Sequence, residues 1–211
     1  MPRFNPFRPG TIVTPGMFCG RVDELVAIEA ILFQTRAGNP QHFLIHGERG
    51  IGKSALFLFL ETVAHGQVES IQSGYFNFLT VNIELDPSTT YLDIIHRIAR
   101  ELKKQVALLT PGLEKLKTTW EFLKRWEVLG VKYAGAQRPG DEQEPLDEMT
   151  MALEQVARET KGLLDGILIL IDEAEKPEAA ANLGGFAKLL TEKSQRRAAT
   201  TSRLVLRDSL Q

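Results

Sequence analysis

One short glycine-rich stretch constrains the fold of this chain more than any other feature. Residues 47–54 read GERGIGKS and match the pattern G-x-x-x-x-G-K-[ST]. Residues 41–46 predict a strand and residues 53–65 predict a helix, so the stretch joins a strand to the start of a helix. Glycines let backbone N–H groups curl around phosphate oxygens, and the helix dipole favours anions there. We therefore predict a phosphate-binding loop at a helix N-terminus.

The loop pattern assigns a role to several of its residues. Lys53 is predicted to reach the outer phosphates and to act in catalysis, and the Ser54 hydroxyl to ligate Mg²⁺. The predicted nucleotide-binding residues of this segment are Gly47, Glu48, Arg49, Gly50, Ile51, Gly52, Lys53, Ser54 and Ala55. By chance alone the pattern arises on the order of once per hundred chains of this size, so a second motif is needed.

An apolar run later in the chain supplies that second motif. Residues 167–171 read ILILI and are followed directly by Asp172 and Glu173. An uninterrupted Ile/Leu strand is what a parallel sheet buried on both faces requires. Carboxylates at its carboxyl end fall where open α/β sheets hold their ligands. The two motifs together indicate a protein that binds a nucleoside triphosphate.

A competing pattern overlaps the loop. Residues 50–55 also fit G-x-G-x-x-G/A, which would imply a nicotinamide or flavin cofactor. That interpretation expects an acidic residue about twenty positions later, at the end of the next strand. The next predicted strand covers residues 75–85 and offers Glu84 or Asp86 only later. It also leaves Lys53 and Ser54 without a phosphate role, so it remains the minor alternative.

Composition sets bounds on the class of protein. The chain has 211 residues, 43% hydrophobic and 25% charged, which predicts one α/β domain with a sizeable core. The net charge of −2 does not support nucleic-acid binding by bulk electrostatics. Cys19 is the only cysteine, so no internal disulfide forms, and we expect it to be a buried apolar residue. No membrane span or signal-peptide core is recognised, and we expect a cytoplasmic location.

The remaining patterns divide the chain. Residues 1–16 predict an extended lead-in, residues 17–211 the globular core, and residues 131–145 a mobile surface loop within it. Trp120 is expected to pack in the core. Helical spacing of apolar residues predicts further helices over residues 21–37, 86–109, 113–123, 149–163 and 183–190.

Residues 18–25, which read FCGRVDEL, precede the loop by a short helix. This arrangement resembles the F-x-G-R-x-x-E-L plus G-x-x-G-x-G-K-[ST] motifs of AAA+ and STAND ATPases, in particular the origin-recognition-like ATPase domains. The resemblance covers about residues 17–190. It implies a three-layer α/β P-loop NTPase fold, with a mostly parallel central sheet and helices on both faces. It also implies that the segment 13–21, ending at Arg21, lies over the adenine of ATP.

The same resemblance implies roles for the other motifs. Lys53 and Ser54 would hold the phosphates and Mg²⁺, Asp172 would support the Mg²⁺, and Glu173 would polarise the attacking water. The position of Glu173 directly after Asp172 agrees with that role. ATP, ADP and Mg²⁺ are the ligands expected on this basis.

The C-terminal part departs from the family pattern. In such ATPases the strand after the Asp-Glu strand lies between it and the loop strand, and a further strand and a helical lid follow. Residues 202–207 are the one candidate for the inserted strand. If they pair, Arg207 or Asp208 takes the sensor position near the γ-phosphate. The lid, second sensor and arginine finger are not identified before Gln211, so we expect a truncated domain without its lid.

Two classes of function follow from these patterns. The first is an ATPase switch that binds and slowly hydrolyses ATP to control a protein partner or a missing C-terminal effector domain. The second is a nucleotide-binding or interaction module without effective turnover, since an open site excludes water poorly. Measured ATP binding and phosphate release distinguish the two.

Overall fold

The computed structural model describes most of the chain between residues 20 and 207. The described residues are 20–39, 41–48, 50–70, 74–109, 120, 123, 143–178, 181–196 and 202–207. The predictions for the lead-in, for Cys19 and for residues 131–142 lie outside them. Among the described residues, no helix is long and apolar enough to cross a membrane.

Helices and strands alternate along most of the described chain, and two helices, α3 and α5, come in succession before β3. Their order is α1 (Val22–Arg36), β1 (Phe43–Ile45), α2 (Lys53–Ala64), β2 (Phe78–Glu84), α3 (Tyr91–Leu109), α5 (Gln143–Glu159), β3 (Gly166–Asp172), α6 (Leu183–Arg196) and β4 (Ser202–Arg207). The strands form a four-stranded sheet in the order β1-β4-β3-β2. Every neighbouring pair is parallel.

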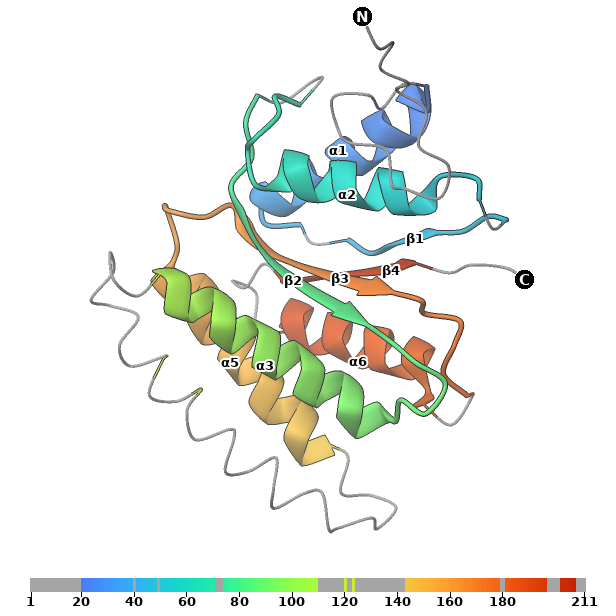
Figure 1. Ribbon diagram of the computed structural model, residues 1–211. Helices are drawn as coiled ribbons and strands as arrows, with labels where there is room; N and C mark the ends of the chain where they lie inside the picture. Colours follow the sequence, from blue (N-terminus) through green and yellow to red (C-terminus); the bar gives the residue numbers. More distant parts are fainter. Residues whose placement is uncertain are drawn as a thin grey trace, which may run out of the picture.

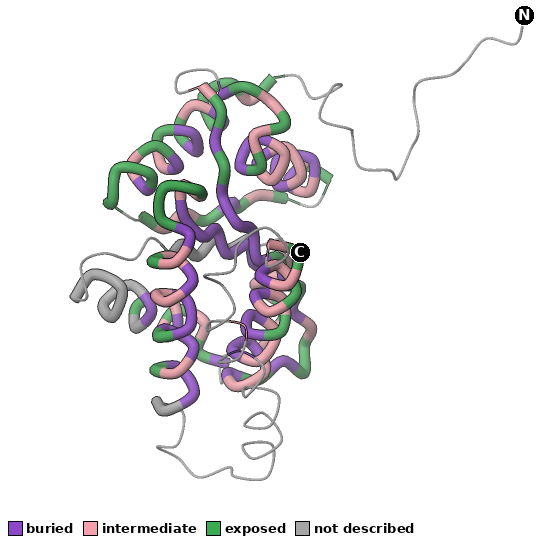
Figure 2. The backbone as a smooth tube through the Cα atoms, turned by 90° about the vertical axis from the view of Figure 1, so that its left-hand side faces the viewer, coloured by how far each residue is buried: buried purple, intermediate pink, exposed green. Residues whose placement is uncertain are grey.

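The sheet is the middle of three layers. Helices α1 and α2 cover one face, and α3, α5 and α6 cover the other (Figure 1). This arrangement confirms the predicted fold class of a parallel sheet with helices on both faces. Buried residues are concentrated between the two helical layers (Figure 2).

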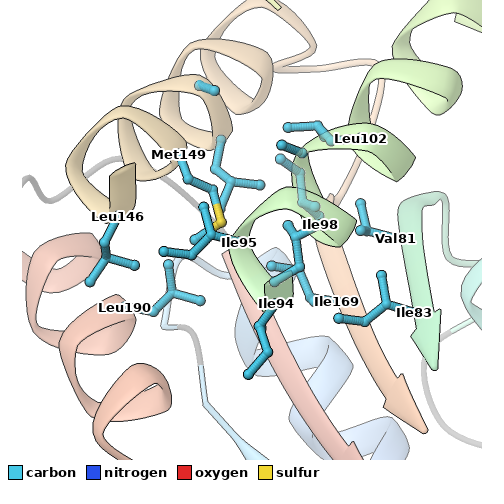
Figure 3. Packing of buried hydrophobic residues seen from close by; sticks show 14 of the residues in the cluster. Val81, Ile83, Ile94, Ile95, Ile98, Leu102, Leu146, Met149, Ile169 and Leu190 are labelled. Atoms are coloured by element: carbon cyan, nitrogen blue, oxygen red, sulfur yellow. The ribbon is translucent and has the colours of Figure 1, made fainter. Parts of the chain in front are cut away.

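Each face of the sheet has its own hydrophobic core. On the α3 side, β2 and β3 pack against three helices, and Figure 3 shows the packing of Val81, Ile83, Ile94, Ile95, Ile98, Leu102, Leu146, Met149, Ile169 and Leu190. On the α2 side, Leu168 and Leu170 of β3 join residues of α1 and α2. Successive side chains of a strand point to opposite faces, so β3 needs apolar residues at every position. Its residues from Ile167 to Ile171 are all 0% exposed.

The position of β4 distinguishes the two interpretations of the glycine-rich loop. β4 lies between β1 and β3, which is the insertion expected of residues 202–207. In a dinucleotide-binding unit, the strand that follows the loop helix lies next to the loop strand. Here that strand is β2, and β4 and β3 separate it from β1. The sheet order therefore contradicts the dinucleotide interpretation.

Two predicted element starts were too early. β2 begins at Phe78 and not at residue 75. The backbone N–H of Asn77 donates to the side chain of Asp165, at Oδ2 and 2.8 Å, and so does not take part in the hydrogen bonds between the strands. α3 begins at Tyr91 and not at residue 86. Thr90 caps it: its backbone N–H and its hydroxyl donate to Asp93 Oδ2 at 2.9 and 2.7 Å. The N–H of Asp93 donates back to the Thr90 hydroxyl oxygen at 3.3 Å, which completes a reciprocal capping box and places the first helical residue after Thr90.

Helix α5 corrects two further predictions. It begins at Gln143, so residues 143–145 of the predicted mobile loop are helical. Pro145 is accepted there because N–H groups in the first helical turn have no intrahelical acceptor. The helix ends at Glu159, and Gly162 has a left-handed φ of 83°. Leu163, predicted as part of the helical stripe, is therefore outside the helix and 51% exposed.

The prediction that Trp120 packs in the core is confirmed. Trp120 packs against the core on that side, and Leu123 is buried in it. The ammonium of Lys103 lies 5.6 Å from the centre of the Trp120 ring. Trp120 therefore contributes to packing, as expected from its helical spacing.

Candidate phosphate-binding site

The carboxyl ends of the strands bring the two predicted motifs to one edge of the sheet. Ile45 of β1 lies opposite Arg207 of β4, and Asp172 of β3 lies opposite Glu84 of β2. Ile171 pairs with the residue before Arg207, so all four strand ends share one row. Neighbouring strands are about 4.8 Å apart, which puts the ends of β1 and β3 about 10 Å from each other. The start of α2 lies on the side toward which the strands point (Figure 1).

The loop that follows β1 has the backbone conformation that its glycines predicted. Gly50 and Gly52 have left-handed φ angles of 85° and 94°, which residues with side chains rarely adopt. Gly52 is also the N-cap of α2, and its carbonyl accepts the N–H of Leu56 at 3.0 Å. The first N–H groups of a helix have no intrahelical acceptor and carry the positive end of its dipole. The loop therefore presents a site suited to an anion.

Lys53 places a buried positive charge in this loop. Its side chain is 5% exposed. Its ammonium donates to the carbonyl oxygens of Gly47 at 2.5 Å and Glu48 at 2.8 Å. These bonds hold the charge beside the N-terminus of α2 and offset part of the cost of burying it. Ser54 follows in the same helical turn and is half-buried, while Arg49 lies outside the described residues.

Arg21 reaches the loop from a distant part of the sequence. It precedes α1 and has a left-handed φ of 55°. Its guanidinium donates from Nη2 to the carbonyl oxygen of Ile51. The segment 13–21 is predicted to lie over the adenine, and residues 13–19 of it lie outside the described residues. In the structure, the side chain of Arg21 therefore contacts the phosphate loop.

Asp172 and Glu173 follow the buried strand at the same edge. Asp172 alternates with Leu168 and Leu170, so its side chain points to the α2 side of the sheet. Its Oδ1 accepts the N–H of Glu173 at 2.7 Å. Glu173 has a left-handed φ of 59°, which is uncommon for a residue with a side chain. Its Oε2 lies 3.6 Å from Nζ of Lys176 in an ion pair.

Sequence patterns did not identify a polar group at the end of β2. Arg97 donates from Nη1 to the carbonyl oxygen of Glu84 at 2.5 Å and from Nη2 to the Asp86 carboxylate. The Ser88 hydroxyl also donates to Asp86, at 2.5 Å. The hydrogen bonds from Ser88 and Arg97 hold the pKa of Asp86 well below its usual range. The group fixes the turn that leaves the sheet edge beside Asp172.

Only the turn within this group has a local signal in the sequence. The triplet of Asp86, Pro87 and Ser88 directly follows the apolar strand and fits an Asx turn. The contact with Arg97, which lies on the next helix, has no local signature. Lys176 was missed for a different reason: the loop after Glu173 has no periodic pattern that would place its side chain.

The described residues contain no group of three or more His, Cys, Asp or Glu side chains that could hold a metal ion by themselves. This does not conflict with the prediction of Mg²⁺. Mg²⁺ usually keeps several waters and is held by one or two protein oxygens together with substrate phosphates. Ser54 and Asp172 offer a hydroxyl and a carboxylate of that kind.

Comparison with protein families gives a match over most of the chain. The model of the family described as AAA ATPase domain matches residues 17–205. Its span includes the Arg21 segment, the loop, Asp172 and most of β4. A comparison with curated proteins found no match.

Proposed function

The chain belongs to the AAA ATPase domain family, and from this premise we propose that it binds ATP with Mg²⁺ at residues 47–54 and hydrolyses it slowly. Nucleotide binding by a P-loop ATPase module is what the family itself implies. The observation that supports the specific site is the shared row at the sheet edge. There the strand ends place the loop after Ile45 and the carboxylate of Asp172 at the same level.

Each residue of the proposed site has a distinct task. The N–H groups of the loop and the ammonium of Lys53 bind the phosphates. Ser54 and Asp172 hold the Mg²⁺, and Glu173 accepts the proton of the attacking water. When bound, ATP and Mg²⁺ supply the phosphoryl group that is transferred and a cation that neutralises its charge. Catalysis of this reaction is mostly positioning and charge stabilisation, so the rigid edge of a buried sheet is a suitable platform.

We further propose that the chain is an origin-recognition-like or STAND-type member that acts as a nucleotide-dependent switch. The support is the FCGRVDEL segment, whose arginine contacts the loop in the structure. A segment that contacts the phosphate loop is positioned to respond to the nucleotide. Such a switch acts on a protein module, either attached or separate. Arg207, the last residue of β4 and level with Asp172, is the proposed sensor.

Slow hydrolysis is expected from the arrangement of Glu173. Its Oε2 lies 3.6 Å from the ammonium of Lys176, and this ion pair competes with the action of the carboxylate on water. Isolated switch ATPases and GTPases without a supplied arginine turn over well below about one per second. We expect the same range for this chain.

Two measurements on the intact chain test the proposal. Titration calorimetry with ATP and ADP in Mg²⁺ measures binding, and release of inorganic phosphate measures turnover. We expect binding of both nucleotides and slow phosphate release that requires Mg²⁺. Absence of nucleotide binding by a folded chain would overturn the proposal.

The Glu173–Lys176 pair also favours a second candidate function, a nucleotide-binding module without turnover. In that case the nucleotide would act as a structural ligand and stabilise the fold by mass action. ATP binding with no phosphate release above the protein-free rate would support this second function. A rise in melting temperature with ATP is expected in both cases and does not distinguish them.

A further inference from the structure

The contact between Arg21 and Ile51 fixes one particular peptide unit of the phosphate loop. The carbonyl of Ile51 and the N–H of Gly52 belong to the same planar peptide. In a trans peptide these two groups point in opposite directions, and the described chain has no cis peptide bonds. When the Arg21 guanidinium holds the Ile51 oxygen on one side, the Gly52 N–H must therefore point to the other.

This peptide unit has unusual freedom without such a contact. Gly50 and Gly52 both have left-handed φ angles, and glycine adopts positive and negative φ about equally well. A peptide next to glycine can turn over at low cost, which would exchange an N–H for a carbonyl on the inner side of the loop. A carbonyl oxygen facing a phosphate would repel it. An anchor on Ile51 is therefore valuable for anion binding.

The anchor itself is held in place by packing. Leu25, Ile28 and Leu32 of α1 share one hydrophobic core with Leu56 and Leu60 of α2. The two helices thus keep a fixed relation, with Arg21 before α1 and the loop before α2. Ordering the guanidinium then costs little additional entropy when a ligand binds.

We propose that Arg21 is a positioning residue for phosphate: it orients the Gly52 N–H toward the bound anion and makes no contact with the base. The inference rests on the proposed function, since it concerns the same loop. It differs from the expectation that the segment around Arg21 recognises adenine. The ligand class concerned is any polyphosphate, with or without a nucleoside.

Binding of pyrophosphate, compared with binding of ATP and GTP, distinguishes a role of Arg21 at the phosphates from a role at the base. The variants are Arg21→Ala, Arg21→Lys and, as matched control, Arg36→Ala. Arg36 lies at the other end of α1, where it covers the rings of Phe33 and Phe76. Calorimetry on the full chain measures the affinity for Mg²⁺-ATP, Mg²⁺-GTP and pyrophosphate. Thermal melting checks that each variant is folded.

We expect Arg21→Ala to weaken ATP and pyrophosphate binding by the same factor, about tenfold, which is the effect of one charge-assisted hydrogen bond. The ratio of ATP to GTP affinity should stay that of the wild type. Arg21→Lys keeps one donor and should recover part of the loss. Arg36→Ala should bind all three ligands as the wild type does.

Four results would overturn the inference. Wild-type pyrophosphate affinity in Arg21→Ala would show that the anchor is not needed, and a changed ATP-to-GTP ratio with unchanged pyrophosphate affinity would assign Arg21 to the base. A wild type that binds no ATP would overturn the proposed function together with this inference. If Arg21→Ala is unfolded, hydrogen exchange decides with Arg21→Lys: faster exchange of residues 47–53 than in Arg36→Ala supports the anchor, and equal exchange overturns it.

Discussion

Nζ of Lys176 lies 3.6 Å from Oε2 of Glu173, within the turn that follows β3. The N–H of Lys176 also donates to the carbonyl of Glu173 at 3.1 Å, so the same turn sets both the backbone and the ion pair. Both side chains are partly exposed, at 38% and 25%. The pair holds the proposed general base toward its own turn and beside a cation.

Lys176→Met removes this cation while keeping much of the length of the side chain. Partly exposed ion pairs are worth up to about 1 kcal/mol, so release of Glu173 should raise phosphate release by up to about fivefold. ATP affinity should stay the same, because Lys176 is not part of the loop. Single-turnover phosphate release with saturating ATP measures the change. A rate below that of the wild type would show that Lys176 assists the reaction.

Glu173→Gln keeps the shape of the side chain and removes its basic oxygen. Loss of a general base typically lowers the rate by about a hundredfold to ten-thousandfold. We expect ATP binding to survive, since Asp172 and the loop are unchanged. Phosphate release and calorimetry on the same preparation measure the two effects. Turnover equal to that of the wild type would remove Glu173 from the mechanism.

Lys53→Ala should abolish most of the triphosphate affinity, because it removes the buried charge that faces the phosphates. It also leaves the carbonyls of Gly47 and Glu48 without this donor, so the empty loop should loosen. The overall fold should remain. Lys161→Ala is the control: it removes an exposed lysine near the opposite edge of the sheet, before β3. Equal ATP affinity in the two variants would contradict the loop assignment.

Acid should weaken the turn at the end of β2. The Ser88 hydroxyl and Arg97 lower the pKa of Asp86 in the folded chain. The stability that Asp86 contributes is therefore present above its unfolded pKa of about 3.9 and is lost as the pH falls toward the folded value. Asp86→Asn should lower the melting temperature at pH 7, and the difference should shrink below about pH 4. Glu69→Gln, at an exposed position, is the control variant measured over the same pH range.

Strong local patterns explain what the sequence could predict. The ILILI run needs apolar contacts on both faces, and only an inner parallel strand provides them, so β3 and its trailing Asp172 were predictable. The glycines of the loop require left-handed backbone angles, and Gly50 and Gly52 have them. In both cases the pattern extends over neighbouring residues and has one physical solution.

Contacts between distant residues had no such signature. Arg21 and Ile51 are thirty positions apart, and the bond depends on how α1 packs against α2. The start of α3 was misplaced because two capping signals overlap there, and the Thr90 box prevails over the turn at Asp86. The sequence does not determine whether residues 202–207 pair between the other strands, since a short apolar strand does not specify its neighbours.

The last prediction concerns the strand that joins the two halves of the site. Val205 of β4 lies opposite Phe43 of β1 and Leu170 of β3. Proline at this position lacks the N–H of the ladder, and proline is excluded from inner strands. An unpaired buried acceptor costs on the order of 1–3 kcal/mol. Val205→Pro should therefore lower the free energy of unfolding by at least that amount.

The same substitution should also weaken ATP binding, because β4 sets the spacing between the loop after β1 and Asp172. Val205→Ala keeps the backbone N–H and serves as the control. Urea unfolding monitored by circular dichroism measures stability, and calorimetry below the transition measures ATP affinity. A Val205→Pro chain with the stability and ATP affinity of Val205→Ala would show that β4 does not hold β1 against β3. A loss of ATP affinity in the proline variant alone, at temperatures where both chains are folded, would show that the backbone ladder of β4 aligns the phosphate loop with the carboxylates.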